Sequence, residues 1–485
     1  MTFSELLTGE LLHPVGGYMA PQATAASDVV TDALSAGADT VFVACVTAIY
    51  DGHDMALTAY QRGCRHFVAE RLLPLPSDAA LLLTPDTREV LGELASRVQG
   101  YPARSLTVVG ITGTHGKTAT ALLAAALLTG SGRKVALLTT DGTDIGDSFS
   151  PAGEIAPDAA DLARFFRRAV AAGAEIAIVE LSAYMLAHGA TKGTPFTVVL
   201  CTDLAPRHIG KGEHADIAAY RAAKARLLEA DAPVAILPVG LADFTPRGRV
   251  LRYGVGEIDA DFRVAEQGTH TVGSVEATSA VFYDGDAAYP IETPLFGVPY
   301  LHNLTAALAL ATILGEQPAR LAGLTPAVRA AGRLDCICPA GGRRVCFDAA
   351  YEAEDLVTVL TTLRGVTKGK LSVLLGSVGG RAYARRAPLG AAALAGADFV
   401  YFTEDDRNGE SARQIALDMV GENADSARYL VMTDRAAAIA AAVLDLRRGD
   451  TLLILGKPRE ETQLVHGKKQ FFSDRRAVLD AIRDF

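Results

Sequence analysis

A strand, a glycine-rich loop and a helix follow one another within residues 106–123, LTVVGITGTHGKTATALL. The apolar run at the start predicts a β-strand, and the Ala- and Leu-rich run after Thr118 predicts a helix. Glycines between them let backbone N–H groups point at an anion, and the helix N-terminus adds partial positive charge. Lys117 can reach the outer phosphates of a nucleotide, and the Thr118 hydroxyl can ligate Mg²⁺. We therefore expect a phosphate-binding loop here.

The loop departs from the usual spacing G-x-x-x-x-G-K-[ST], because Ile111 stands where the first glycine is expected. Gly110 and Gly113 lie on either side of it. The alternative is a chance Gly-Lys-Thr in a chain that contains 46 glycines. The flanking strand and helix favour the phosphate-binding interpretation.

Apolar runs alternate with Ala-rich, helix-like stretches along the whole chain, which predicts an α/β protein with parallel sheets covered on both faces. At 485 residues the chain is too long for one core. We expect three domains: a small α/β domain over 1–104, a central domain over 105–329 and a second doubly wound domain over 330–485. The expected strands lie at 41–45, 80–84, 106–111, 135–139, 175–180, 196–201, 234–238, 344–347, 371–375, 399–402, 429–432 and 451–455. A segment near 250–295, with alternating Tyr, Val and Thr, predicts an antiparallel insertion.

Polar residues follow several of these strands directly. Glu180 ends one expected strand, and Asp203 and His208 follow the next. Because ligands bind at the carboxyl ends of parallel strands, we expect these side chains on the same rim as Lys117. The loops at 376–381 and 456–461 follow strands of the last domain and should line a ligand site for the same reason.

Composition restricts the partners and the compartment. A formal net charge of −10 argues against nucleic acid or an anionic membrane as the main partner, although it leaves room for a local basic pocket. The six cysteines form no C-x-x-C pair, so we expect buried free thiols in a reducing compartment. With no signal peptide and no apolar run long enough to span a bilayer, we expect a cytoplasmic protein.

A collinear series of short motifs resembles the Mur ligase family, and within it the UDP-N-acetylmuramoyl-tripeptide synthetases, with a divergent acceptor site. Each motif is weak alone, but their shared order over nearly the whole chain is specific. The motifs are TGTHGKT (112–118), YRAAK (220–224), HN (302–303), GRLD (332–335), Asp348 after Phe347, GSVGGRAYARR (376–386), TEDDRNGE (403–410), GKPREETQ (456–463) and FSD (472–474).

The resemblance implies an ATP-dependent, ADP-forming acid–amino-acid ligase. It implies an acceptor-binding domain at 1–104, a P-loop-type ATP-binding domain at 105–329 and a Rossmann-like ligase domain at 330–485. ATP would phosphorylate a carboxylate to an acyl phosphate, which an amine then attacks to form an amide. The acceptor implied is a UDP-N-acetylmuramoyl peptide in peptidoglycan precursor synthesis. Small-molecule substrates and a monomer are the expectation.

The resemblance also implies a role for individual residues. The catalytic set is Lys117, Glu180, His208 and Lys224. The ATP contacts are Gly113, Thr114, His115, Gly116, Lys117, Thr118, Ala119, Asn303, Arg333 and Asp348. The Mg²⁺ ligands are Thr118, Glu180, His208 and Lys224, the lysine being carbamoylated because CO₂ capture would turn its amine into an anion. The contacts to the incoming amino acid are Arg386, Asp405, Asp406, Asn408 and Glu460, and those to the acceptor are Ile155, Ala156 and Ser182.

Departures from the family pattern gather at acceptor positions. Ile155-Ala156-Pro157 stands where the family has Thr-Thr-Pro, and Ser182-Ala183-Tyr184 stands in place of Ser-Ser-His. A lost hydroxyl removes affinity that an alanine cannot restore. We therefore predict a ligase whose acceptor contacts differ from the usual ones. Arg407 replaces the proline of D-N-P-R, so the loop does not indicate meso-diaminopimelate, and lysine or another amine stays open.

Other classes of protein remain as alternatives. A Mur-like paralogue could join a carboxylate that carries no UDP. A P-loop phosphotransferase would need neither a second nucleotide-binding domain nor Lys224. A non-catalytic partner of another ligase would not need the set of Lys117, Thr118, Glu180, His208 and Lys224. Without the resemblance, Lys224 would be taken as a solvated helix lysine and His208 as a loop histidine.

Overall fold

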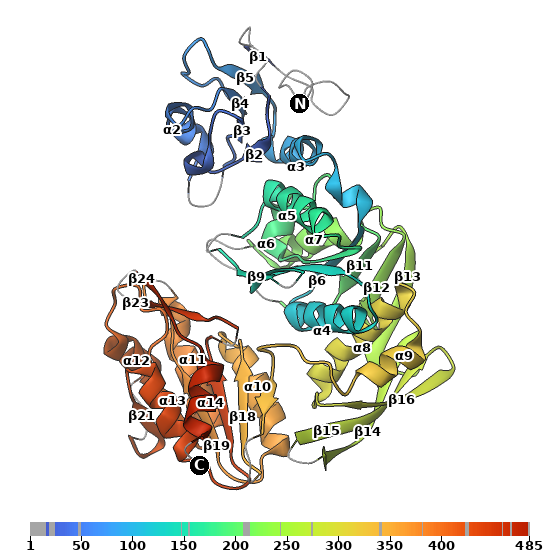
Figure 1. Ribbon diagram of the computed structural model, residues 1–485, viewed down its shortest axis with the longest axis vertical. Helices are drawn as coiled ribbons and strands as arrows, with labels where there is room; N and C mark the ends of the chain where they lie inside the picture. Colours follow the sequence, from blue (N-terminus) through green and yellow to red (C-terminus); the bar gives the residue numbers. More distant parts are fainter. Residues whose placement is uncertain are drawn as a thin grey trace. The chain divides into compact units, whose positions relative to one another are not determined.

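The computed structural model describes residues 16–18, 25–46, 50–146, 148–153, 156–206, 214–242, 244–272, 275–338, 342–380, 382–421, 426–457, 459–465 and 468–483. The chain forms two compact units (Figure 1). The first comprises residues 1–263 with 305–317, and the second 264–304 with 318–485. The fold is α/β with parallel-rich sheets, as expected. The three domain boundaries stay a prediction.

The start of the first unit forms a five-stranded sheet in the order β1-β5-β4-β3-β2. Strands β2 to β5 pair in parallel, and β1 joins β5 antiparallel. Its elements are β1 (Gly16–Tyr18), β2 (Asp28–Val30), β3 (Thr40–Val43), α2 (Ala56–Gln61), β4 (His66–Ala69), β5 (Ala80–Leu83) and α3 (Thr87–Val98). The expected strand–helix–strand pattern is confirmed.

The larger sheet of the first unit has the P-loop strand β6 (Thr107–Thr112) at its centre, between β11 and β10. The order runs β13-β12-β11-β6-β10-β7, all parallel, and then antiparallel through β8 and β9. Figure 1 shows helices beside this sheet, α4 on one side and α5 to α7 on the other. The elements are α4 (Lys117–Gly130), β7 (Val135–Thr139), β8 (Gly142–Ile145), β9 (Ser148–Pro151), α5 (Ala159–Ala171), β10 (Ile176–Glu180), α6 (Ala183–Ala187), β11 (Val198–Cys201), α7 (Ile217–Leu228), β12 (Val234–Pro238) and β13 (Arg249–Val255).

Three long strands follow: β14 (Phe262–Val272), β15 (Val275–Asp284) and β16 (Ala287–Thr293). β15 and β16 pair antiparallel, as expected for the segment near 250–295, whereas β13 at the start of that segment pairs in parallel with β12. Two helices come next, α8 (Val298–Ile313) and α9 (Pro318–Leu324). α8 is apolar on nearly all sides and mostly buried. In the part of the chain that the structure describes, no helix is long and apolar enough to cross a membrane.

The last sheet has the order β17-β18-β22-β19-β20-β21, parallel except for the edge strand β17. A separate hairpin joins β23 and β24. The elements are β17 (Asp335–Ile337), β18 (Arg344–Asp348), α10 (Ala353–Val366), β19 (Leu371–Leu375), α11 (Tyr383–Gly396), β20 (Phe399–Phe402), α12 (Ala412–Val420), β21 (Tyr429–Val431), α13 (Arg435–Leu444), β22 (Thr451–Leu455), β23 (Thr462–Val465), β24 (Lys468–Phe471) and α14 (Asp474–Ile482).

The expectation that all six cysteines are free thiols is wrong for two of them. Cys336 and Cys346 form a disulfide, whereas Cys45, Cys64, Cys201 and Cys338 lie outside it. The two bonded residues lie directly opposite each other on the antiparallel strands β17 and β18, with Cα atoms 4.0 Å apart. Spacing along the sequence could not reveal this pairing, because strand register creates it.

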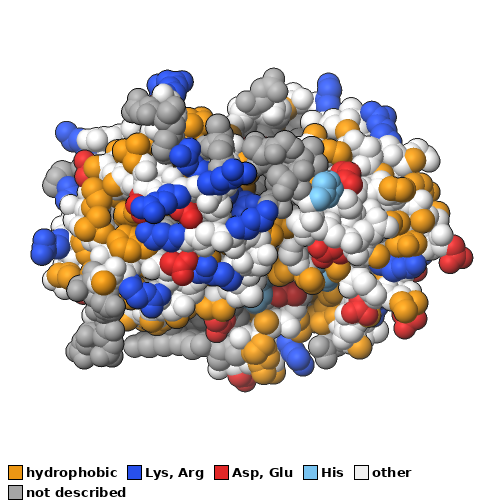
Figure 2. Space-filling view, turned by 90° about the horizontal axis from the view of Figure 1, so that it is seen from below, with side chains coloured by type: hydrophobic (Ala, Val, Ile, Leu, Met, Phe, Trp, Pro, Cys, Tyr) orange, Lys and Arg blue, Asp and Glu red, His pale blue; other side chains and the backbone are white. Residues whose placement is uncertain are grey.

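Basic side chains are unevenly distributed over the surface despite the negative net charge. In the view of Figure 2, several Lys and Arg side chains gather in one region, with a few acidic side chains among them. The net charge of −10 therefore does not decide the sign of any local surface.

A buried ion pair ties α13 to α14 at the carboxyl end of β22. Arg435 and Asp474 are each 1% exposed and meet through two hydrogen bonds of 2.7 and 2.6 Å. Arg435 also donates to the carbonyl of Leu455, the last residue of β22, at 2.7 Å. The Asp of the FSD motif thus has a structural partner.

We expect Arg435→Ala to destabilise the second unit by about 3–5 kcal/mol, because it leaves the Asp474 carboxylate buried without its cation. Urea unfolding followed by hydrogen exchange in peptides of β22 and α14 measures this locally. Arg483→Ala is the matched control, since Arg483 pairs with Asp480 at the surface and should change stability by at most about 0.5 kcal/mol. Equal effects of the two substitutions would contradict the assignment.

Candidate active site

The phosphate-loop glycines are required by geometry. Gly113 has φ +148° and Gly116 has φ +76°, both in the region that disfavours side chains. A Cβ on Gly113 would lie 1.8 Å from Oγ1 of Thr202, which follows β11. Helix α4 then begins at Lys117, so its first N–H groups face the loop. The predicted phosphate loop therefore has the strand, turn and helix that it needs.

Asp203 holds the loop in shape, a role that sequence reasoning missed. Its Oδ1 accepts the backbone N–H groups of Thr114 and His115 at 2.6 and 2.7 Å, and its Oδ2 lies 2.6 Å from His115 Nδ1. Burial opposes ionisation of Asp203, but the hydrogen bonds from His115 and Thr114 prevail and lower its pKa. The position of Asp203 after a strand predicted that it lies at the carboxyl edge of the sheet. Nothing in the sequence indicated its contact with His115, 88 residues away.

Glu180 joins Lys117 and Thr118 in one cluster. Its Oε2 accepts the Thr118 hydroxyl at 2.8 Å and the Thr140 backbone N–H at 3.2 Å. Its Oε1 lies 4.0 Å from Lys117 Nζ, beyond hydrogen-bonding distance. Glu180 is 2% exposed, so this carboxylate needs a cation nearby. The structure thus brings together three residues that the sequence predicted to act together.

Lys224 of α7 lies fully buried beneath the loop. Its Nζ donates to the Gly113 carbonyl at 2.6 Å and lies 4.6 Å from the ring centre of Tyr220. Burial, and then the charge of Lys117, lower the pKa of Lys224 to about 7. Near neutral pH a large share of this amine is therefore uncharged, which makes it a nucleophile. The interpretation of Lys224 as a solvated helix lysine is excluded by its burial.

Two of the predicted site residues lie outside the described residues: His208, predicted to act in catalysis and metal binding, and Ile155, predicted to contact the acceptor. The other predicted acceptor contacts, Ala156 and Ser182, are described. Ala156 is exposed, and the Ser182 hydroxyl caps α6 by accepting the Met185 N–H at 3.2 Å. Tyr184, on the same helix, stacks on His188 with ring centres 4.0 Å apart. Ser182 thus already has a structural bond.

The predicted nucleotide contacts Asn303, Arg333 and Asp348 belong to the second unit. Asn303 is 8% exposed, on α8. Asp348 ends β18 and accepts from Leu334 N–H at 2.7 Å, Ala350 N–H at 2.8 Å and the Tyr300 hydroxyl at 3.3 Å. Burial raises the pKa of Asp348, although Arg333 and these donors oppose the rise. In this structure the carboxylate organises the start of the last sheet.

Three of the predicted amino-acid contacts gather around Lys457, which was not among the predicted site residues. Lys457 Nζ lies 2.7 Å from Asp406 Oδ1, 3.0 Å from Glu460 Oε2 and 3.5 Å from Asp405 Oδ1. Although burial lowers the pKa of Lys457, Asp405 and Glu460 raise it above the usual value. Three carboxyl groups thus surround one ammonium after the ends of β20 and β22, although burial raises the pKa of Glu460 and Arg435 also acts electrostatically on Asp405 and Glu460. Lys457 lies in the GKPREETQ motif at 456–463, and this motif is the sequence feature that could have identified it as a site residue.

Arg386 lies in the first turn of α11, and Asn408 lies in the loop between β20 and α12. Arg386 is 1% exposed; it donates to both oxygens of Glu410 at 2.7 Å and to Asp418 at 2.8 Å. The hydrogen bond with Arg386 lowers the pKa of Glu410 to about 2. Asn408 donates to the Gly379 carbonyl at 3.0 Å. Arg386 therefore orders these loops here, and its direct contact with a substrate carboxylate stays a prediction.

In the described part of the chain, no three His, Cys, Asp or Glu side chains are arranged to hold a metal ion. Glu180 and Thr118 do fit Mg²⁺, because this ion commonly takes one or two protein oxygens and completes its shell with phosphate and water. The Glu180 Oε1 atom, which faces Lys117 at 4.0 Å, would supply negative charge to the ion.

We expect Lys224→Met to stabilise the first unit at pH 7 by about 1–3 kcal/mol, because it removes a buried, partly charged amine. With a folded-state pKa of about 7 against the ordinary 10.5, the unfolded chain binds more protons between these values. Wild-type stability therefore rises with pH across that window, and the gap to Lys224→Met should close by about pH 10. Urea unfolding in bicarbonate-free buffer measures this, with the exposed Lys134→Met as control; a variant less stable at pH 7 would refute the burial argument.

Two family descriptions match the chain: "Mur ligase middle domain" over residues 111–311 and "Mur ligase, glutamate ligase domain" over residues 332–458. The UDP-N-acetylmuramoyl-L-alanyl-D-glutamate–2,6-diaminopimelate ligase of Geobacillus thermodenitrificans is 31% identical over 449 residues, which cover 90% of each chain. A solved structure of a ligase with the same name has a TM-score of 0.67 at 24% identity and covers 100% of this chain and 99% of its own.

A solved MurF ligase from Thermotoga maritima in complex with ADP has a TM-score of 0.57 at 20% identity, covering 94% of this chain and 97% of its own. The two family matches together span more than half of the chain, and they contain the phosphate loop, Glu180, Lys224, Asp405, Asp406 and Lys457. The resemblance drawn from the motifs is confirmed. The chain belongs to the Mur ligase family and is an ATP-dependent, ADP-forming ligase.

Proposed function

We propose that the protein joins the terminal carboxylate of a UDP-N-acetylmuramoyl peptide to the amine of an amino acid, in peptidoglycan precursor synthesis. The observation that carries this is the cluster of Lys117, Thr118 and Glu180 beside the buried Lys224. A simple phosphotransferase needs no such lysine. The named relative at 31% identity supplies the substrate class. We further propose a monomeric, cytoplasmic enzyme with domains at 1–104, 105–329 and 330–485.

The residues of the phosphate loop would hold and orient the transferred phosphate. The N–H groups at the start of α4 face the loop, and Lys117, whose ammonium donates to the Thr114 carbonyl in this structure, would bind the outer phosphates. Thr118 and Glu180 would hold Mg²⁺, which neutralises charge on the phosphates when bound. Phosphorylation of the acceptor carboxylate gives an acyl phosphate; amine attack then releases phosphate and forms the amide. Gly113 to Ala119, with Asn303, Arg333 and Asp348, remain the proposed nucleotide contacts.

We propose that Lys224 is carbamoylated in the working enzyme. A pKa of about 7 provides the uncharged amine that reacts with CO₂. The product is an anion, which would relieve the repulsion between Lys224 and Lys117 and could share a second Mg²⁺ with His208. The pH range in which the amine is uncharged is the range in which modification proceeds.

The cluster of Asp405, Asp406 and Glu460 around Lys457 supports binding of a cationic amine. A substrate ammonium placed there would offset negative charge of these carboxylates that Lys457 alone does not neutralise. The loop lacks D-N-P-R, so we propose a diamino acid such as lysine ahead of meso-diaminopimelate. Asn408 donates to the backbone carbonyl of Gly379, and Arg386 donates to the carboxylate of Glu410.

A second candidate is a Mur-type ligase for a carboxylate that carries no UDP. It is favoured by the acceptor segment, where Ser182 is engaged as a helix cap and the Tyr184 ring, 39% exposed, stacks on His188. An aromatic pair there presents a flat apolar face in place of hydroxyl donors. Isothermal titration with UDP-N-acetylmuramoyl-dipeptide separates the two: affinity in the micromolar range supports the first proposal, and no binding supports the second.

We expect Glu180→Gln to lower acceptor-dependent ADP release by about 100-fold or more, because the neutral amide no longer holds the cation beside the phosphate. The measurement is steady-state ADP release with mass detection of the amide product. Glu175→Gln, on the exposed side just before β10, is the matched control and should keep wild-type turnover. Retained turnover in Glu180→Gln would refute the proposed role.

We expect Glu460→Gln to raise KM for the amine about tenfold with little change in KM for ATP, since it weakens a charge-assisted contact with the substrate ammonium. Initial rates at varied amine concentration measure this. Glu461→Gln changes an exposed neighbour of the same type and should leave both constants unchanged. A rise in the KM for ATP alone would contradict the assignment.

A further inference from the structure

A disulfide fastens the edge strand that opens the last sheet. β17 has three residues, all half-buried, and pairs only with β18 in the sheet order. The bond joins Cys336 to Cys346, the central pair of this short ladder. An edge strand of three residues has little pairing of its own, so a covalent link at its centre decides how firmly it is held.

The two bonded residues lie next to two predicted nucleotide contacts. Arg333 precedes Cys336 by three residues, and Asp348 follows Cys346 by two. Between them Leu334 has φ +48°, a strained value for a non-glycine residue, and its N–H is held by Asp348 Oδ2 at 2.7 Å. The conformation that aims Arg333 therefore depends on β17 staying against β18.

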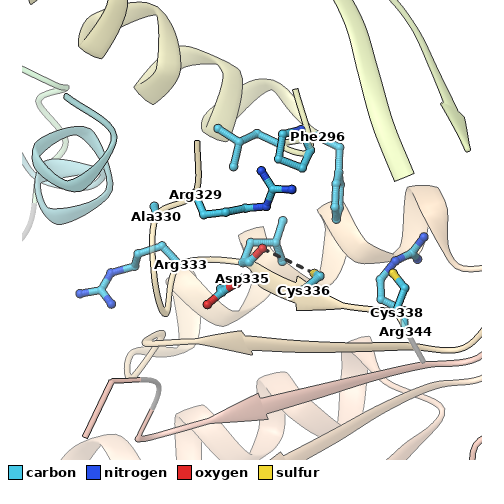
Figure 3. A pocket seen from close by; sticks show the side chains of 11 residues that line it. Phe296, Arg329, Ala330, Arg333, Asp335, Cys336, Cys338 and Arg344 are labelled. Atoms are coloured by element: carbon cyan, nitrogen blue, oxygen red, sulfur yellow. Dashed lines mark hydrogen bonds between the residues drawn. The ribbon is translucent and has the colours of Figure 1, made fainter. Parts of the chain in front are cut away.

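The two bonded residues differ in burial. Cys346 is 0% exposed, whereas Cys336 is half-buried and lines a small pocket with Cys338, Arg329 and Arg344. Figure 3 shows Arg329 reaching between Phe296 and Cys336, and Arg344 beside Cys338. Guanidinium groups near a sulfur stabilise its thiolate, which makes a disulfide easier to open and re-form.

Cys45, Cys64 and Cys201 are not part of this pocket. Burial raises the pKa of Cys45 to about 11 and that of Cys201 to about 12, and it also raises the pKa of Cys64. These thiols are buried and stay protonated at neutral pH. The redox-accessible sulfur atoms among the described residues are thus confined to the pocket beside β17.

We propose that Cys336 and Cys346 form a redox-active site that sets the affinity of this ligase for nucleotide, an inference that rests on the proposed function for its nucleotide readout. A thiolate of a cellular dithiol attacks Cys336 Sγ; the Cys336–Cys346 bond breaks, and Cys346 leaves as a thiolate and takes a proton. The second thiol of the dithiol then attacks the mixed disulfide and releases Cys336. Two electrons pass to the protein, and the dithiol becomes a disulfide. Reduction frees β17 and weakens the placement of Arg333.

The first experiment counts thiols in the full-length protein. Protein equilibrated with oxidised glutathione, or with dithiothreitol, is denatured and labelled with maleimide, and the labels are counted by intact mass. We expect four labels after oxidation and six after reduction, because two of the six cysteines share the bond. Peptide mapping should assign the two protected sites to Cys336 and Cys346. Six labels in both samples would overturn the proposal.

The second experiment measures affinity for a fluorescent ATP analogue with Mg²⁺ in each redox state, without acceptor or amine. We expect binding about fivefold weaker or more after reduction, the low end of usual coupling between sites. Cys336→Ala should bind weakly in both states, and Cys346→Ala repeats the test from the other strand. Cys338→Ala, in the same pocket but outside the bond, should keep the wild-type difference.

The outcomes separate this inference from the proposed function. Equal affinity in the two redox states, with nucleotide bound in both, overturns the redox inference and leaves the ligase proposal standing. Absence of nucleotide binding in both states refutes the nucleotide role itself, and with it the regulatory part of this inference. Loss of the redox difference in Cys338→Ala would also overturn the pairing proposed here.

Discussion

The hydrogen bond from Lys224 Nζ to the Gly113 carbonyl, 2.6 Å long, is the interaction on which the candidate site depends. It ties α7 to the turn of the phosphate loop from below, where no solvent reaches. A buried amine costs stability that an apolar side chain would not cost. The fold tolerates the Lys224 amine because this amine contacts a backbone carbonyl, the face of a ring and a hydroxyl. None of these is a carboxylate that would hold the amine in its charged form. An amine kept buried and only weakly basic is better explained by chemistry than by packing.

The same arrangement recurs at the ends of the parallel strands in both units. Glu180 at the end of β10, Asp203 after β11 and Asp348 at the end of β18 each accept at least one hydrogen bond from a loop backbone N–H. A carboxylate at such a point does two things at once: it fixes the loop and sets the local negative potential. The carboxylates that shape the loops therefore also supply the negative charge at this edge of the sheet. This explains why few additional exposed charges are needed near Lys117.

The strands could be predicted from the sequence because their apolar runs are short, continuous and separated by helices; the runs at 135–139, 234–238 and 371–375 are strands in full. The phosphate loop and the position of Glu180 at a strand end were also predictable from local motif and spacing, whereas Lys224 was identified only through the resemblance to the Mur ligase family. What could not be predicted depends on contacts between distant segments: Asp203 on His115, and the disulfide across β17 and β18. The hydrogen bonds of Arg386 to Glu410 and Asp418 could not be predicted either, because a sequence shows that a guanidinium is present but not which carboxylate it binds.

The contrast between the phosphate side and the acceptor side explains where this chain can diverge. Around the loop, Glu180 and Asp203 each accept hydrogen bonds from loop groups, so that changing either carboxylate leaves those donors unsatisfied at a cost of about 1–3 kcal/mol per donor. The described acceptor residues are different: Ala156 is exposed, and Ser182 is needed only for a helix cap worth about 1 kcal/mol. Substitutions there change what is bound without endangering the fold. Substrate specificity can therefore drift while the ATP-dependent step is retained, as the pattern of substitutions in this chain indicates.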